Sequence, residues 1–153
     1  MAKDEDIYFM KEAIKEAGYA FQEDEVPVGC VIVKDKRIIA RGHNQVELLQ
    51  DSTAHAEMIA LTAACEALKS KWLNDCTLYV TIEPCSMCAG AMVLARIKRL
   101  VFGCFDPKTG ACGSVVNIIH NKKLNHRILI TSGILKEDCK IILQEFFKGK
   151  RKK

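Results

Sequence analysis

The sequence has no apolar run long enough to span a bilayer, and it has no internal repeat, low-complexity segment or linker. Four of its first six residues are charged, where a signal peptide would need an apolar stretch. These absences predict a cytoplasmic protein that does not insert into membranes. With 153 residues, 49% of them hydrophobic, the chain is long enough to bury a core without disulfides. We therefore expect one domain over residues 1–153.

Acidic residues are missing from the end of the chain. Residues 148–153 contain five of the 23 basic residues and none of the 19 acidic ones. The net charge of +4 comes from this basic C-terminal tail, because the rest of the chain has 18 basic and 19 acidic residues. Such a tail could meet the phosphates of a nucleic acid, or it could be a solvated chain end.

Hydrophobic periodicity and turn residues indicate the order of the secondary-structure elements. We expect helices over residues 7–21, 53–68, 86–97, 115–120 and 135–146, and strands over 26–33, 38–40, 77–82, 99–102 and 127–131. Residues 42–50 and 106–114 are polar enough to be loops, and residues 51–53 offer N-cap side chains. This order predicts an α/β fold with three layers, α/β/α, in which helices cover both faces of a five-stranded mixed sheet.

Two short motifs, at residues 53–57 and 83–88, contain the residues that can carry chemistry. Of the eight cysteines, only Cys85 and Cys88 have the spacing of metal ligands, and at a helix start both sulfurs lie on one face. Unpaired backbone N–H groups there stabilise thiolates. We expect His55 in the first turn of its helix, where it can bind the same metal. Glu57 would then approach the substrate side without being a ligand.

Three protein ligands leave a tetrahedral zinc ion with one free position. A water bound there has its pKa lowered to about 7 and can attack an electrophilic carbon. A nearby carboxylate can pass the proton of that water to a ring nitrogen and then to a departing amine, and Glu57 fits this relay. The pattern therefore predicts hydrolytic deamination, in which a carbonyl replaces an exocyclic amino group and ammonia leaves.

Two other interpretations of the same residues stay open. A structural zinc would need a fourth ligand, which would come from Cys30, Cys104, His43 or His126. None of these four stands in a ligand-spaced pair. A redox pair at Cys85 and Cys88 is the second alternative, but the surrounding sequence lacks a thioredoxin-like βαβ opening.

The pattern H-x-E followed by P-C-x-x-C is the known signature of the zinc-dependent cytidine deaminase superfamily. More narrowly, the sequence resembles the bacterial tRNA-specific adenosine deaminases. The matching stretches extend over nearly the whole chain: residues 25–29, 43–44, 51–57, 81–91, 101–103, 106–108, 113–114, 125–126 and 146–147. The superfamily signature alone leaves several substrates open, so the flanking stretches carry the narrower resemblance.

The resemblance implies a cytidine deaminase-like fold with one Zn²⁺ per subunit, held by His55, Cys85 and Cys88, and Glu57 as the proton shuttle. It also implies a cytoplasmic homodimer in which the partner subunit helps to form the RNA site. The implied substrate is the wobble adenosine of a tRNA anticodon loop, which is converted to inosine. An unpaired loop is a sensible target, because its bases are easier to extract than those of a duplex.

The resemblance further implies a set of substrate-binding residues. These are Val28, Asn44, Ala56, Asp106, Lys108, Phe146 and Phe147. Val28 and Asn44 match the base pocket, with Asn44 as a hydrogen-bonding partner of the nucleoside, and the backbone at Ala56 would face the base or the water. Asp106 and Lys108 match a loop along the RNA, but residues 106–110 also have the composition of a simple turn. Phe146 and Phe147 could stack on a base, and we expect at least one of them in the core.

Two alternative functions remain beside tRNA editing. The protein could deaminate a free base or nucleotide, of the guanine or cytosine type, since the zinc motif is shared. It could also be a non-catalytic, zinc-containing RNA-binding subunit. Glu57 counts against the second alternative, because a purely structural zinc has no use for that carboxylate.

Overall fold

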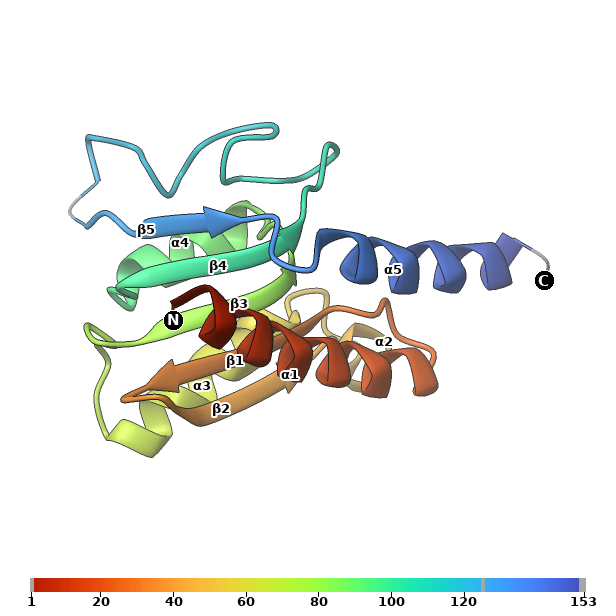
Figure 1. Ribbon diagram of the computed structural model, residues 1–153, viewed down its shortest axis with the longest axis horizontal. Helices are drawn as coiled ribbons and strands as arrows, with labels where there is room; N and C mark the ends of the chain where they lie inside the picture. Colours follow the sequence, from red (N-terminus) through yellow and green to blue (C-terminus); the bar gives the residue numbers. More distant parts are fainter. Residues whose placement is uncertain (1, 125, 152–153) are drawn as a thin grey trace.

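The computed structural model describes residues 2–124 and 126–151. Its centre is a five-stranded sheet with the strand order β2-β1-β3-β4-β5 (Figure 1). The strands are β1 (Gly29–Lys34), β2 (Arg37–His43), β3 (Thr77–Ile82), β4 (Arg99–Cys104) and β5 (Leu129–Ser132). Strand β1 is antiparallel to both of its neighbours, whereas β3, β4 and β5 run parallel. The predicted mixed sheet is therefore confirmed.

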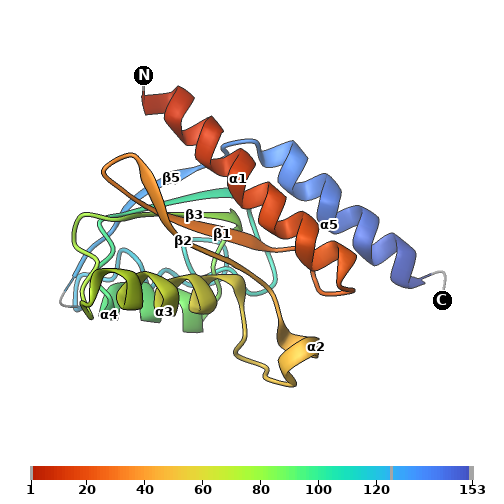
Figure 2. The same ribbon diagram turned by 90° about the horizontal axis from the view of Figure 1, so that it is seen from below.

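Helices cover both faces of this sheet (Figure 2). Helices α1 (Ala2–Gln22) and α5 (Lys136–Arg151) lie on one face, and α3 (Ala56–Leu68) and α4 (Ser86–Leu94) lie on the other. A short helix, α2 (Val46–Leu49), follows the end of β2. The three-layer α/β/α arrangement is confirmed. None of the helices within the described residues has both the length and the apolar character needed to cross a membrane.

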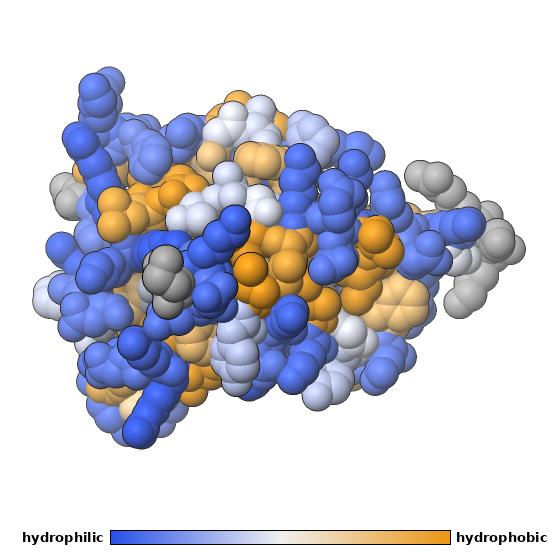
Figure 3. Space-filling model, viewed as in Figure 1, coloured by the Kyte–Doolittle hydropathy of each residue, from blue (hydrophilic) through white to orange (hydrophobic). Residues whose placement is uncertain are grey.

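Two apolar clusters fill the space between the layers. Along β1, Cys30 and Ile32 belong to the cluster under α3 and α4, whereas Val31 and Val33 belong to the cluster under α1 and α5. Successive side chains of a strand point to opposite faces, so a strand covered on both sides is a continuous apolar run. Figure 3 shows that the outer surface of α1 and α5 is mostly hydrophilic, with apolar side chains exposed along the line between the two helices.

Two glycines allow the helices to approach the sheet closely. A Cβ at Gly29 would lie 1.9 Å from the backbone oxygen of Ala13 in α1. A Cβ at Gly42 would lie 2.5 Å from the backbone oxygen of Ala56 in α3. Both distances are far below van der Waals contact, so these positions accept only glycine without moving a helix. The sheet thereby holds the start of α3 in place.

Three predicted elements differ from the structure. Residues 115–120 are not helical; Asn117 of this segment instead forms an isolated bridge with Cys112. The predicted loop at residues 42–50 contains α2, and residues 148–151 of the predicted basic tail continue α5, with Lys150 paired to Asp24 at 2.7 Å. Residues 152–153 lie outside the described residues. The helix prediction was wrong because the preceding loop bonds to a distant carboxylate, as described below.

An ion pair between the buried Asp6 and the partly buried Arg99 ties α1 to the parallel strands. Asp6 accepts hydrogen bonds from Arg99 at 2.8 and 2.6 Å and from the Tyr79 hydroxyl at 2.7 Å. Arg99 also donates to Thr131 at 2.8 Å, so the network joins α1, β3, β4 and β5. Burial raises the pKa of Asp6, but its bonds with Arg99 and Tyr79 outweigh burial and hold this pKa below its ordinary value.

We predict that Asp6→Asn lowers the free energy of unfolding by about 2 kcal/mol near neutral pH, because it leaves the partly buried Arg99 without a charged partner. Ionised Asp6 stabilises the fold above its unfolded pKa of about 3.9, and this contribution disappears as the pH falls through the lower folded pKa. Urea unfolding at several pH values should show the difference from the wild type shrinking in acid. Asp4→Asn, an exposed change in the same turn, is the control, and an equal loss in both variants would contradict the prediction.

Candidate active site

The three predicted metal ligands meet at two helix N-termini. His55 is the N-cap residue of α3 and Cys85 is the N-cap residue of α4, and both have extended backbone conformations. The Nδ1 atom of His55 lies 3.7 Å from the Cys85 sulfur and 3.6 Å from the Cys88 sulfur. The expectation that His55 lies in the first turn of its helix was wrong by one residue, because the helix begins at Ala56.

This group of side chains suits a metal ion. The donor atoms of His55, Cys85 and Cys88 all lie within 4.8 Å of one another, and within residues 2–124 and 126–151 no other His, Cys, Asp or Glu trio does so. One imidazole and two sulfur ligands form the set that holds zinc in catalytic sites with an open position. Hydrogen bonds from the Cys88 thiol and from His55 hold the pKa of Cys85 well below its ordinary value, whereas the bond to Cys85 and burial raise the pKa of Cys88. A low pKa favours the thiolate, which is the form that binds metals.

The residues considered as a fourth ligand lie outside this group. His43 bonds to Glu16 and Glu23, and the Nε2 atom of His126 bonds to a backbone oxygen at 2.7 Å. The Cys104 thiol donates to the Thr81 backbone oxygen at 3.5 Å, and Cys30 is fully buried in the core. The trio therefore has the composition of an open site, as a catalytic metal requires.

A cavity of about 400 Å³, which we call the active-site pocket, opens beside the trio. This volume suits one small ligand or one base. The pocket is lined by Val26, Val28, Asn44, His55, Glu57, Ile82, Glu83, Cys85, Asp106, Pro107, Lys108, Thr109, Leu143 and Phe147. These residues come from all three layers, so the pocket exists only in the folded chain.

Glu57 and Glu83 are the buried carboxylates of the pocket. Glu57, in the first turn of α3, is only 3% exposed, and this burial raises its pKa to about 7. Burial also raises the pKa of Glu83, but four hydrogen bonds to its carboxylate outweigh burial and hold this pKa below its ordinary value. Paired carboxylates whose pKa values are pushed apart have different roles. Glu57 is the one poised to accept and release a proton near neutral pH.

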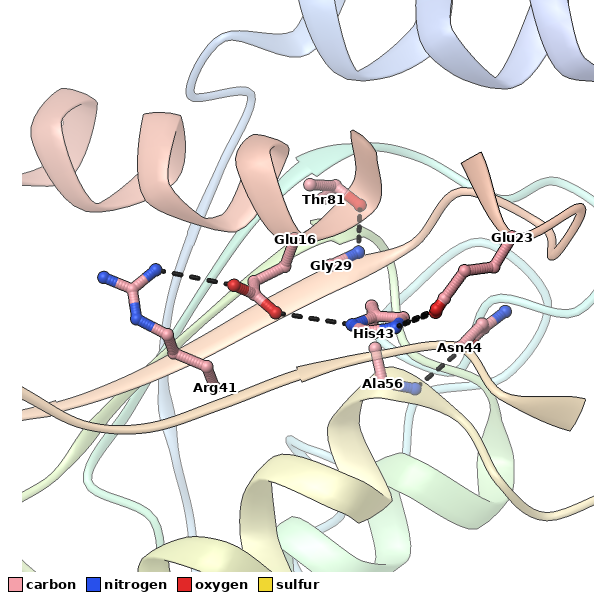
Figure 4. Close-up of polar contacts among 8 residues, drawn as sticks. All are labelled: Glu16, Glu23, Gly29, Arg41, His43, Asn44, Ala56 and Thr81. Carbon is pink, nitrogen blue, oxygen red and sulfur yellow. Dashed lines mark hydrogen bonds and ion pairs between the residues drawn. The ribbon is translucent and has the colours of Figure 1, made fainter. Parts of the chain in front are cut away.

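Asn44 has a structural role that sequence reasoning missed. Its side-chain oxygen accepts a hydrogen bond of 2.9 Å from the backbone N–H of Ala56, the first residue of α3 (Figure 4). The Asn44 amide nitrogen is the group that can donate to a ligand in the pocket. Ala56 is fully buried, and its N–H is taken by Asn44, so it does not line the pocket.

A histidine next to Asn44 is held by one carboxylate of α1, from Glu16, and by a second, from Glu23 in the turn that follows α1. His43 contacts Glu23 at 2.7 Å and Glu16 at 3.4 Å, and Glu16 also pairs with Arg41 at 3.5 Å (Figure 4). These contacts hold the end of β2 against α1, directly before Asn44. His43 is 27 residues away from Glu16 and 20 residues away from Glu23, so no local sequence pattern could have predicted these contacts.

The remaining predicted substrate-binding residues divide into two groups. Asp106, Lys108, Phe147 and Val28 line the pocket. The Asp106 carboxylate accepts hydrogen bonds from the backbone N–H groups of Lys108 and Thr109, which is the turn foreseen as an alternative. Phe147 is 44% exposed, whereas Phe146 is 7% exposed and packs against Phe21. Phe146 is therefore the core member of the pair.

The three-layer fold, the His/Cys/Cys group and the buried Glu57 define the chain as a deaminase with the cytidine deaminase-like fold. A sequence model of the MafB19-like deaminase family matches residues 3–151. The chain is 50% identical over 149 residues to a tRNA-specific adenosine deaminase of Bacillus subtilis strain 168, covering 97% of this chain and 92% of that protein. It therefore belongs to the family of tRNA-specific adenosine deaminases.

Solved structures agree with this assignment. One, from a study of A-to-I editing by tRNA:A34 deaminases at the wobble position of transfer RNA, matches with a TM-score of 0.86 and 45% identity over 89% of this chain and 99% of that chain. A guanine deaminase from Nitrosomonas europaea matches with a TM-score of 0.77 and 24% identity over 90% of this chain and 81% of that chain. At this low identity the second match shows only a shared fold.

We predict that two substitutions separate the roles of Asn44. Asn44→Ala removes the acceptor for the Ala56 N–H and should lower the free energy of unfolding by about 1 kcal/mol. Asn44→Asp keeps an acceptor oxygen and should change it by less than about 0.5 kcal/mol. Both variants lack the amide donor, so both should deaminate more slowly than the wild type. Full activity in Asn44→Asp would show that the amide nitrogen does not contact the substrate.

Proposed function

We propose that this protein converts adenosine to inosine at the wobble position of a tRNA anticodon loop by hydrolytic deamination. The observation that carries the proposal is the open His55/Cys85/Cys88 group beside the buried Glu57, in a pocket sized for one base. Membership of the tRNA-specific adenosine deaminase family supports the choice of substrate.

The residues of the pocket can perform the required proton transfers. When His55, Cys85 and Cys88 hold a zinc ion, that ion supplies the Lewis acidity that lowers the pKa of a water to about 7. Glu57 accepts one proton of the water at its carboxylate and delivers it to a ring nitrogen of the base. It then accepts the second proton, from the hydroxyl group that has added to the base, and delivers it to the departing amine. One water is consumed and one ammonia is released for each inosine formed.

The other lining residues favour a base that is presented by a loop. Val28 and Leu143 provide apolar walls, and the Asn44 amide can donate to the nucleoside. Phe147 and Lys108 are exposed while they line the pocket, so a base can stack on the first and a phosphate can approach the second. A free base has neither a neighbouring base to stack on Phe147 nor a phosphate to approach Lys108.

We also infer that the active form is a homodimer, as the family resemblance implies. Deamination of a free guanine or cytosine is the second candidate function, and it rests on the shared fold.

The proposal predicts that the zinc-loaded protein forms inosine in an anticodon stem-loop with adenosine at the wobble position. Digestion of the product to nucleosides followed by mass spectrometry measures this inosine. Glu57→Gln is the matched control, and it should keep the metal while losing activity by about 1,000-fold, because the proton carrier is gone. An unchanged stem-loop combined with deamination of free guanine or cytosine would overturn the proposal. Retained activity in Glu57→Gln would overturn the mechanism.

We further predict that Cys88→Ala loses both the zinc and part of the stability. Cys88 lies in the first turn of α4, so a metal bound there joins α4 to the start of α3 at His55. Elemental analysis should find well under one zinc per chain, and the melting temperature should fall. Cys65→Ala, a half-buried cysteine outside the trio, is the control and should keep its zinc. Full zinc occupancy in Cys88→Ala would contradict the ligand assignment.

A further inference from the structure

Glu83 lies at the centre of a hydrogen-bond network that the proposed reaction does not use. It directly follows β3, precedes Cys85 by two residues, and is 2% exposed. Its carboxylate accepts backbone N–H bonds from Asp106 at 3.1 Å, Cys112 at 3.0 Å and Ser114 at 3.1 Å. The Ser114 hydroxyl donates a fourth bond. Four donors occupy the lone pairs of one carboxylate, so Glu83 has no capacity left for chemistry.

The segment from residue 106 to residue 114 wraps around this carboxylate. A Cβ at Gly110 would lie 2.5 Å from a Glu83 oxygen, so only glycine lets the segment close over it. Ala111 donates to the Pro84 backbone oxygen at 2.8 Å, which adds a second link to the same turn. We call residues 106–114 the wall loop. It forms no helix, because three of its N–H groups bond to Glu83 and two others bond to the side chain of Asp106.

The wall loop forms one side of the active-site pocket. Asp106, Pro107, Lys108 and Thr109 all line the pocket, and Lys108 is exposed to an incoming substrate. The metal-binding sulfur of Cys85 and the anchor at Glu83 belong to one short segment, Glu83-Pro84-Cys85. Hydrogen bonds to this segment therefore set the position of the wall loop relative to the reacting centre.

We propose that Glu83 is a positioning residue that fixes the wall loop against the metal-binding turn and thereby determines how tightly the RNA loop is bound. This inference rests on the proposed function. His55 and Glu57 lie at the start of α3. Cys85 is the N-cap residue of α4 and Cys88 lies in the first turn of that helix, so the two helices hold these four side chains even when the wall loop moves. A displaced wall loop therefore weakens substrate binding more than it slows the chemical step.

Glu83→Gln tests the proposal, because it keeps the shape of the side chain but places an amide against backbone N–H donors. We expect amide hydrogen exchange in residues 106–114 to accelerate by about 10-fold. With the stem-loop substrate, KM should rise by about 10-fold while kcat stays within about 3-fold and one zinc per chain is kept. Gly110→Ala leaves Glu83 intact but pushes the wall loop outward, so it should reproduce the rise in KM even if Glu83→Gln fails to fold.

Asp6→Asn is the matched control, because Asp6 is a buried carboxylate that lies outside the pocket lining. It should lower the stability without changing KM or the exchange of residues 106–114. An unchanged KM in both Glu83→Gln and Gly110→Ala would overturn the proposal, and so would a joint loss of zinc and kcat. A wild-type protein that fails to form inosine would count against the proposed function. The exchange measurement would still decide whether Glu83 anchors the wall loop.

Discussion

The meeting of two helix starts at one end of the sheet is the constraint on which the site depends. Helix α4 connects the parallel strands β3 and β4, so its first turn follows the carboxyl end of β3, where ligands of α/β proteins commonly bind. Helix α3 begins beside it, held against β2 by the close approach at Gly42. The first turn of a helix has unpaired N–H groups and a partial positive charge, which stabilise a thiolate such as that of Cys85.

Buried carboxylates organise the rest of the molecule, and their surroundings give them different roles. Asp6 is matched by Arg99 and ties α1 to the sheet, whereas Glu25 accepts the N–H groups of Glu47 and Leu48 at 3.0 and 2.8 Å and holds the start of α2. Glu83 binds the donors of a loop. Glu57 is also buried, but the groups around it stabilise its charged form less than burial destabilises that form, so its pKa is raised to about 7. An anchoring carboxylate has its hydrogen bonds satisfied, while a proton carrier must be free to change its charge.

Predictions from local patterns succeeded where one element determines its own structure. Strand β3 has the predicted bounds, Thr77–Ile82, because its β-branched run is stopped by Glu83 and Pro84. The expected helix at residues 115–120 failed because the segment before it bonds to Glu83, which is 31 residues away from Ser114. The start of α3 was misplaced for a similar reason. The expected N-cap side chains at residues 51–53 are not the ones used, since Asn44 supplies the hydrogen bond to Ala56.

The two motifs alone were enough to name the candidate ligands and to predict hydrolytic deamination. The spacing of His55, Glu57, Cys85 and Cys88 within two short motifs limits the chemistry that they can perform. The folded chain was needed to see that Asn44 bonds to the start of α3 and that Glu83 holds the wall loop. It also showed that Phe147 faces the pocket while Phe146 joins the core. The physical reason is that hydrogen bonds and packing between distant segments leave no periodic pattern in the sequence, whereas ligand spacing along one element does.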